Sequence, residues 1–294
     1  MHTRSSRPMN ILRVLDEATR VLKRRVGVAA RLDAEVLLSH CVHTDRVHLY
    51  ARSERVLTVP EREEFASCVR RRLRGEPVAY IVGEKEFWSL LFEVNHHVLI
   101  PRPETEILVE EVLKICHSIG NSPKILEIGT GCGAISVSLA HELRRARIVA
   151  TDISREAISV AMSNAKRHGV EHQISFHEGS LFQPVSGFFD VIVSNPPYIS
   201  EAEFARLPRD VHEFEPETAL LAGADGHLFH REIARLGASH LEGGGWLLME
   251  IGSGQRDQVQ HILGESGFYD SVTFRTDYAG LVRVSIARRN TAGG

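Results

Sequence analysis

The chain has few cysteines and no long apolar run. No two cysteines are close enough to form a Cys-x-x-Cys pair; they are Cys41, Cys68, Cys116 and Cys132. This spacing argues against a zinc site or a disulfide framework and favours reduced thiols. No apolar stretch approaches membrane-spanning length, and the first residues lack the apolar segment of a signal peptide. We therefore expect a cytoplasmic protein without a membrane partner.

Metal-binding motifs and a strong net charge are also missing. The 16 histidines show no ligand spacing such as His-Glu-x-x-His, so no metal site is expected. The net charge of −3 is unevenly distributed, because residues 1–95 carry 17 Lys and Arg against 13 Asp and Glu. This mild positive charge can favour an acidic or nucleic-acid-bearing partner, or it is only the solvated surface of helices.

The first part of the chain has the apolar spacing of helices. Apolar residues recur at helical intervals from Asn10 onward, and further helices are expected near Asp33 and after Pro60. Gly75 can end the last of these helices. Residues 1–76 are therefore predicted to form a small helical bundle, and they contain no catalytic constellation.

The chain changes character after this bundle. Short runs rich in β-branched and aromatic residues predict an extended or hairpin linker over residues 77–100, with its first extended segment at 78–83. Residues 101–290 alternate strands with helices, which predicts an α/β domain with a mostly parallel sheet. The last two expected strands, at 271–274 and 281–286, are joined by a turn and would add an antiparallel hairpin to that sheet.

A glycine-rich turn follows the first strand of the α/β domain. Residues 127–133 read Glu-Ile-Gly-Thr-Gly-Cys-Gly, and Asp152 ends the next strand. Glycines let the backbone approach a ligand closely, and an acid at that place can accept hydrogen bonds from both ribose hydroxyls. Tight strand-to-helix packing also explains the glycines. Their alternate spacing and the carboxylate of Glu127 favour S-adenosylmethionine over a nicotinamide dinucleotide, which prefers Gly-x-Gly-x-x-Gly.

A second motif, Asn-Pro-Pro-Tyr at residues 195–198, follows an apolar run that predicts a buried strand. Two prolines cannot continue a strand, so Asn195 is held at its C-terminal end, where ligands bind in open α/β sheets. The Asn195 side chain and the Pro196 carbonyl offer two acceptors, and Tyr198 offers a flat aromatic face. This set suits an amide or amino group; the alternative is a simple turn.

Residues 100–106, Ile-Pro-Arg-Pro-Glu-Thr-Glu, predict an extended approach followed by the start of a helix. Arg102 in this segment is either a substrate or cofactor contact or the partner of a nearby carboxylate. The sequence leaves both interpretations open.

Together these residues resemble a known family. The glycine turn with Glu127 and Asp152, combined with Asn-Pro-Pro-Tyr, is similar to class I S-adenosylmethionine-dependent methyltransferases that act on amide or exocyclic amino nitrogens. Residues 83–88, 101–106 and 214–216 resemble more specifically the HemK/PrmC family, the protein-(glutamine) methyltransferases of peptide chain release factors. The similarity covers nearly the whole chain. It implies a Rossmann-like methyltransferase sheet ending in an antiparallel hairpin, behind an N-terminal bundle that helps to bind the protein substrate.

The resemblance also implies a reaction and a set of site residues. The substrate would be the glutamine of the Gly-Gly-Gln loop of release factors, methylated at N5, with S-adenosylhomocysteine as the other product. The implied catalytic residues are Asn195, Pro196 and Tyr198. The implied substrate-binding residues are Asn195, Pro196, Pro197, Tyr198 and Arg102. The implied cofactor-binding residues are Glu127, Gly129, Thr130, Gly131, Cys132, Gly133, Asp152, Ser180, Leu181 and Asn195.

One position departs from the family pattern. Relatives often have Asp where this chain has Ser180, near the expected place of the adenine. Serine can still donate or accept a hydrogen bond. Adenine recognition is therefore expected to rest on the backbone and on Leu181 or Phe182.

Other functions share parts of this pattern. A nucleic-acid amino-methyltransferase would use the same Asn-Pro-Pro-Tyr on a flipped base, but no separate basic recognition domain is present, so no direct nucleic-acid partner is expected. A non-catalytic cofactor-binding adaptor would use the helical bundle for interaction, but it has no need of both Asn195 and Asp152. A nicotinamide dehydrogenase fits least, because of the glycine spacing.

Overall fold

A computed structural model describes residues 9–120 and 122–291. They group into two compact units: residues up to 83 together with 209–214, and residues 84–208 together with those from 215 onward. Residues 1–8 of the predicted bundle lie outside the described residues. None of the helices in the described part of the chain has the length and apolar character needed to span a bilayer.

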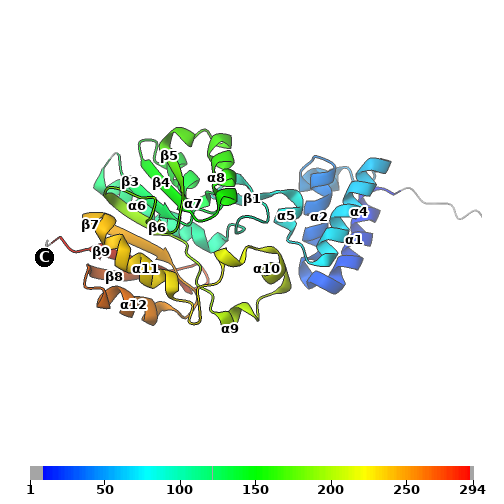
Figure 1. Ribbon diagram of the computed structural model, residues 1–294. Helices are drawn as coiled ribbons and strands as arrows, with labels where there is room; N and C mark the ends of the chain where they lie inside the picture. Colours follow the sequence, from blue (N-terminus) through cyan, green and yellow to red (C-terminus); the bar gives the residue numbers. More distant parts are fainter. Residues whose placement is uncertain (1–8, 121, 292–294) are drawn as a thin grey trace, which may run out of the picture. The chain divides into compact units, whose positions relative to one another are not determined.

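The first unit is helical (Figure 1). Its elements are α1 (Ile11–Val26), η1 (Gly27–Ala29), α2 (Ala30–Cys41), α3 (Arg46–Ala51), α4 (Val59–Arg74), α5 (Val78–Val82) and α10 (Arg209–Phe214). Ile11, Leu37 and Phe65 belong to its apolar core, as the helical spacing predicts. Thr58 caps α4, and Gly75 ends it in the left-handed conformation.

The extended segment predicted for residues 78–83 is wrong. Residues 78–82 form α5, which begins after Pro77 and ends at Gly83 with a φ of 80°. Their apolar, β-branched composition fits a strand as well as a buried helical turn, and a run this short does not separate the two. The six-residue helix α3, capped by Asp45, is also absent from the sequence-based prediction.

The predicted hairpin is present, but it is not a separate linker. Strands β1 (Glu84–Phe87) and β2 (Leu90–Glu93) pair antiparallel, and Trp88 makes the turn with a φ of 53° rather than extending a strand. The side chain of Asn164 accepts from the amide of Glu93 at 2.7 Å and donates to its carbonyl at 3.0 Å. The hairpin is therefore fastened to the second unit.

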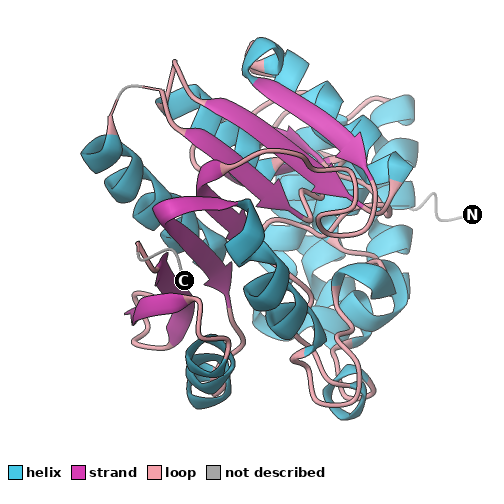
Figure 2. Cartoon of the chain, turned by 60° about the vertical axis from the view of Figure 1, so that its left-hand side comes forward, coloured by secondary structure: helices cyan, strands magenta, loops and turns pink. Residues whose placement is uncertain are grey.

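The second unit is built on a seven-stranded sheet with helices on both faces (Figures 1 and 2). The strands are β3 (Lys124–Ile128), β4 (Arg147–Asp152), β5 (Ile174–Glu178), β6 (Phe189–Ser194), β7 (Leu241–Glu250), β8 (Tyr269–Thr276) and β9 (Val282–Arg289). Their order is β5-β4-β3-β6-β7-β9-β8, and only the pairs that include β9 are antiparallel. The predicted α/β sheet with a closing antiparallel hairpin is confirmed.

Helices cover this sheet in two layers. The helical elements are η2 (Pro103–Thr105), α6 (Glu106–Ile119), α7 (Ala134–Glu142), α8 (Arg155–Arg167), η3 (Glu171–Gln173), α9 (Glu201–Phe204), η4 (Glu217–Ala219), α11 (Leu228–Gly237), η5 (Ala238–His240) and α12 (Arg256–Glu265). Leu126 and Ile192 pack with Ile233 of α11 and Val259 of α12. Because strand side chains alternate, Ile125 and its equivalents face the layer of α6, α7 and α8.

The strand order reverses between β3 and β6. From β3 the chain moves outward through β4 to β5, and then returns to the other side of β3 with β6. In open parallel sheets, ligands bind at the carboxyl ends of the strands that flank such a reversal. Those two ends carry residues 129–133 and Asn195, so the fold brings the two predicted motifs to one place.

Candidate active site

A pocket of about 480 Å³ lies where the strand order reverses. Residues at the carboxyl ends of β3, β4 and β6 line it, with parts of 97–105 and 216–221. Most of the predicted site residues line it: Arg102, Glu127, Gly129, Thr130, Gly131, Cys132, Asp152, Ser180, Leu181, Asn195, Pro196 and Pro197. Gly133 and Tyr198 are not among its lining residues.

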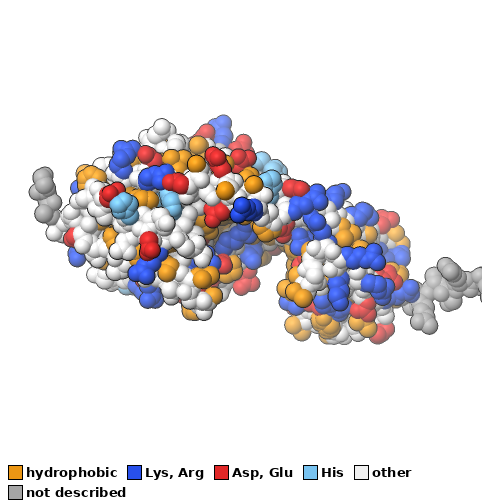
Figure 3. Space-filling view, turned by 90° about the horizontal axis from the view of Figure 1, so that it is seen from below, with side chains coloured by type: hydrophobic (Ala, Val, Ile, Leu, Met, Phe, Trp, Pro, Cys, Tyr) orange, Lys and Arg blue, Asp and Glu red, His pale blue; other side chains and the backbone are white. Residues whose placement is uncertain are grey.

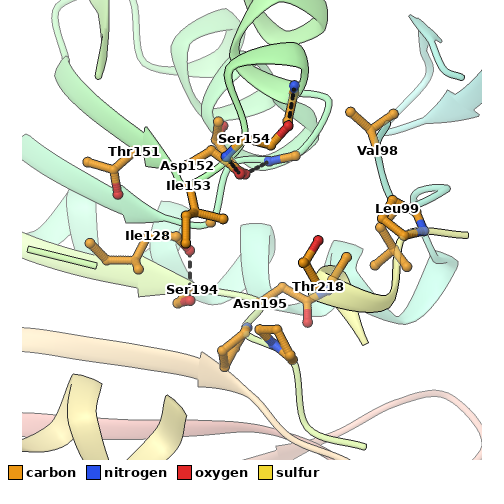
Figure 4. Close-up of a pocket in the computed structure, with 18 of the residues that line it drawn as sticks. Val98, Leu99, Ile128, Thr151, Asp152, Ile153, Ser154, Ser194, Asn195 and Thr218 are labelled. Carbon is orange, nitrogen blue, oxygen red and sulfur yellow. Dashed lines mark hydrogen bonds between the residues drawn. The ribbon is translucent and has the colours of Figure 1, made fainter. Parts of the chain in front are cut away.

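Asp152 holds the glycine turn in place. The amide of Gly131 donates to Oδ2 of Asp152 at 2.8 Å, and the amide of Ser154 donates to Oδ1 at 2.9 Å (Figure 4). The Ser154 hydroxyl caps α8 by accepting from the Ala157 amide at 3.1 Å. Burial raises the pKa of Asp152, and these backbone donors oppose the increase. Each carboxylate oxygen keeps a further acceptor position that a ribose hydroxyl can use.

Gly133 serves packing rather than lining the pocket. It has a φ of +82° at the start of α7, and a Cβ added there would lie 3.2 Å from Cβ of Ala161 in α8. Glycine therefore lets α7 and α8 approach each other closely. For this one glycine, the packing interpretation of the motif fits the geometry.

Glu127 is a buried carboxylate with one unsatisfied oxygen. Its side chain is almost inaccessible, and Oε2 accepts from Oγ1 of Thr130 at 2.7 Å and from the Ser136 amide at 3.2 Å. Oε1 has no hydrogen-bond partner within residues 9–120 and 122–291. Burial raises the pKa of Glu127 to about 8. A buried acceptor without a partner is costly, so this wall of the pocket is suited to a ligand that donates or carries positive charge.

The segment after β5 contributes Ser180 and Leu181 to the pocket. The Leu181 carbonyl accepts from Oγ1 of Thr151 at 3.3 Å, and Leu181 itself has a φ of 49°. Phe182 is buried instead and stacks on His240, with 5.0 Å between ring centroids. Of the two apolar residues expected near the adenine, the pocket therefore includes Leu181 and not Phe182.

Several lining residues were not predicted. Apolar and polar side chains from distant segments complete the wall: Val98, Leu99, Ile153, Thr218, Phe229 and Ile233. Ile153 follows Asp152 directly and is 64% exposed, and Thr218 lines the same pocket. For Ile153 alone there was a local signal in the sequence, because it directly follows the acid that ends a strand. The others come from segments whose proximity depends on the folded chain.

Asn195 lies across the pocket from Asp152 (Figure 4). Its Nδ2 donates to Oγ1 of Thr105 at 3.2 Å, and Thr105 Oγ1 donates to Oε2 of Glu250 at 2.6 Å. Ser194 fixes the preceding backbone, because its hydroxyl donates to the Ile128 carbonyl at 2.8 Å. With Nδ2 engaged, Oδ1 of Asn195 is the side-chain atom left to accept from a ligand.

Tyr198 is fixed to the carboxyl end of β7. Its hydroxyl donates to Oε1 of Glu250 at 3.4 Å, and its carbonyl accepts from Nε2 of Gln255 at 2.9 Å. Gln255 also accepts from the Gly252 amide at 2.9 Å. Burial raises the pKa of Tyr198 and keeps the phenol neutral. Neither Glu250 nor Gln255 was predicted, although an acid at the end of a strand was a signal for the first.

Arg102 pairs with a carboxylate, which is one of the two interpretations left open by the sequence. Its guanidinium donates to Oε1 of Glu215 at 2.5 Å, and the Ile100 amide donates to Oε2 of the same buried carboxylate at 3.2 Å. Arg102 also lines the pocket. The pairing with Glu215 and a contact with substrate are therefore compatible.

Fold and site together define a class of protein. On one side of the strand-order reversal lie a glycine turn and an acid placed to bind ribose hydroxyls, and on the other side lies Asn-Pro-Pro-Tyr. This arrangement characterises a class I methyltransferase. A solved methyltransferase structure from Pyrococcus furiosus shares the fold, with a TM-score of 0.52 and 19% identity over 76% of this chain and 99% of that chain. Residues 103–213 match the methyltransferase small domain family, and residues 13–83 match the PrmC N-terminal domain family.

Two relatives narrow the class. The release factor glutamine methyltransferase of Chlorobaculum tepidum is 42% identical over 262 residues, which cover 86% of this chain and 88% of the relative. The one from Geobacter sulfurreducens is 41% identical over 278 residues, or 93% and 95% of the two chains. The chain belongs to the release factor glutamine methyltransferase family, and the predicted resemblance is confirmed.

Proposed function

We propose that this protein transfers a methyl group from S-adenosylmethionine to the side-chain amide nitrogen, N5, of the glutamine in the Gly-Gly-Gln motif of peptide chain release factors. Membership of the family supports this function. The observation that carries it is the orientation of Asn195, whose Nδ2 is engaged by Thr105. Its Oδ1 can therefore accept an N–H of an amide substrate at the edge of the pocket.

The pocket residues fit S-adenosylmethionine. The unpartnered Oε1 of Glu127 suits the amino group of the methionine moiety, and Asp152 suits the ribose hydroxyls. Ile153 and Leu181 offer apolar surface to the adenine, and Ser180 offers one hydroxyl. When bound, this cofactor supplies an electrophilic methyl group, and S-adenosylhomocysteine is the product that leaves.

The remaining chemistry is the orientation of a poor nucleophile. An amide nitrogen has a lone pair delocalised into its carbonyl. Asn195 Oδ1 and the Pro196 carbonyl would each accept one N–H of the glutamine, which directs the lone pair toward the methyl donor. Positioning of this kind, rather than proton abstraction, would supply most of the acceleration. Once the nitrogen has gained the methyl group, it loses a proton to water.

Three further residues complete the proposed substrate site. Tyr198 would present its ring to the flat glutamine amide while its hydroxyl stays bound to Glu250. Pro197 and Arg102 line the pocket and would contact the residues that flank the glutamine. Glu215 would hold the Arg102 side chain in place.

The helical unit is the proposed docking module for the release factor. Lys and Arg side chains are prominent on the face of this unit seen in Figure 3. Exposed basic residues end two of its helices: Lys23, Arg24 and Arg25 in α1, and Arg74 in α4. Such a surface would favour an acidic protein partner. We propose the cytoplasm as the site of action, because release factors act on ribosomes there.

The test is transfer of labelled methyl from S-adenosylmethionine to a purified release factor. A factor with Gln→Ala in its Gly-Gly-Gln motif and a DNA duplex are tested in parallel. Label on the wild-type factor alone is the expected result. Label on DNA would favour a nucleic-acid amino-methyltransferase, and label on neither would reject the proposed substrate. Binding of the cofactor without transfer to any of them would favour the adaptor alternative.

A further inference from the structure

Glu250, at the carboxyl end of β7, receives hydrogen bonds from two hydroxyl groups of the site. Oγ1 of Thr105 lies 2.6 Å from one of its oxygens, and the Tyr198 hydroxyl lies 3.4 Å from the other. The side chain is almost completely buried, at 2% exposure. Burying a carboxylate costs free energy unless it is well hydrogen-bonded. The burial of Glu250 behind the Asn-Pro-Pro-Tyr loop therefore indicates that it has a function there.

The direction of these hydrogen bonds follows from the chemistry of the groups. Burial raises the pKa of Glu250 to about 7, so above pH 7 most molecules hold it ionised. An ionised carboxylate only accepts, and in those molecules the single hydroxyl proton of Thr105 is directed at Glu250. The oxygen of Thr105 can then only accept from its other neighbour, Asn195. It therefore selects the NH2 end of the Asn195 amide, which could otherwise be turned by 180° at little steric cost.

We propose that Thr105 and Glu250 are positioning residues that set which end of the Asn195 amide faces the substrate. The proposal rests on the proposed function, because the substrate is taken to be an amide that presents two N–H groups. In the observed orientation, Oδ1 of Asn195 is available to accept one of them. In the turned orientation, the NH2 group of Asn195 would face the NH2 group of the glutamine, and two donors cannot pair.

In this proposal Thr105 acts through Asn195 rather than on the substrate, and its surroundings fix its position. It ends η2, in the Pro-Arg-Pro-Glu-Thr-Glu segment, and only 4% of its surface is exposed. It is separated from Asn195 by 90 positions and from Glu250 by 145. Three segments distant in sequence thus meet in one line of hydrogen bonds, which links the carboxyl ends of β6 and β7 to the start of α6.

The decisive variant is Thr105→Val, which keeps the shape of the side chain and removes the hydroxyl. We expect its kcat on release factor to fall on the order of tenfold to a hundredfold, the range for a misplaced orienting group. The dissociation constant of S-adenosylhomocysteine should not change, since Asn195 orientation affects the substrate amide. Thr105→Ser is the matched control, because it restores the hydroxyl, and its kcat should stay near that of the wild type.

A double variant tests whether the two residues act as one chain. In Glu250→Gln, the amide can donate to or accept from Thr105, so the direction is no longer forced and an intermediate kcat is expected. Thr105→Val/Glu250→Gln should then be no slower than Thr105→Val alone. Additive losses, a wild-type rate for Thr105→Val, or a Thr105→Ser variant as slow as Thr105→Val would each overturn the proposal.

A second readout needs no release factor. The side-chain amide of Asn195 is followed by NMR in protein labelled with ¹⁵N-asparagine, and its signals are assigned with Asn195→Asp. In Thr105→Val we expect these signals to move and their hydrogens to exchange faster, whereas Thr105→Ser should resemble the wild type. Unchanged signals in Thr105→Val would overturn the positioning role. A wild-type enzyme that fails to methylate release factor would instead reject the proposed function, and the two failures are therefore distinguishable.

Discussion

Replacing the ionisable carboxyl of Glu127 with an amide should abolish a proton release that accompanies cofactor binding. Burial raises the pKa of this carboxyl to about 8, and Asp152 nearby adds to the increase. At pH 7 a group with that pKa is protonated in about nine-tenths of the molecules. If its unpartnered Oε1 receives the cationic amino group of the ligand, the ionised form is favoured. Binding at pH 7 should then release up to about one proton.

The affinity for S-adenosylhomocysteine should depend on pH. Since binding releases a proton, the affinity should increase with pH below about pH 8, by up to about tenfold per pH unit. The amino group of the ligand is itself titratable. The affinity of Glu127→Gln at the same pH is therefore the reference. The wild-type advantage over this variant should be small near pH 6 and should grow toward pH 7.5.

The assay is isothermal titration calorimetry with S-adenosylhomocysteine in two buffers that differ in ionisation enthalpy. The difference between the apparent enthalpies gives the number of protons released. Glu127→Gln keeps the hydrogen bond from Thr130 and should release none. Glu178→Gln, an exposed carboxylate outside the pocket, is the control and should behave as the wild type. Equal proton release in the wild type and Glu127→Gln would refute a contact between Glu127 and a cationic ligand group.

Two other variants test the Asn-Pro-Pro-Tyr loop. Asn195→Ala should lower kcat about 10²- to 10³-fold, the usual loss for one preorganised acceptor or donor, and should weaken S-adenosylhomocysteine binding far less. Asn290→Ala, outside the pocket, is the control, and a kcat for Asn195→Ala comparable with the wild type would contradict the mechanism. Gly226→Ala should lower both kcat and Tm, because its Cβ would lie 2.7 Å from the Tyr198 carbonyl at a φ of +76°. Gly264→Ala, inside α12 with open space around it, is the control and should leave Tm unchanged or raise it. Equal Tm values for the two glycine variants would show that the Asn-Pro-Pro-Tyr loop can move to accommodate the added Cβ.

Local patterns predicted much of the fold because each strand of the sheet has its own apolar run. The glycine turn, Asp152 and Asn195 were recognisable since each directly follows such a run, and the strand order brings their ends together. The failure at α5 has a local cause: a short β-branched run is compatible with a strand or a helical turn until its neighbours are known.

The network behind the site could not be predicted in the same way. Thr105 and Glu250 are 145 positions apart, and Arg102 and Glu215 are 113 apart. No spacing rule relates such residues, because their contact depends on how η2, β7 and the loop before α11 meet in the folded unit. An isolated acid at a strand end, such as Glu250, gives only a weak signal. The family resemblance includes the segment that contains Thr105, but it does not indicate a function for the Thr105 hydroxyl.

Because α10 belongs to the helical unit, the two units cannot be separated by cutting the chain at one point. The chain passes from one unit to the other after residues 83, 208 and 214, so a single cut at any of these places leaves the two units covalently joined. A fragment that ends at Gly83 would lack Asp210, which lies 3.9 Å from Arg72, and Phe214, which lies beside Gly75. Phe214 and Glu215, adjacent in sequence, therefore belong to different compact units, and neither unit corresponds to one uninterrupted stretch of the gene.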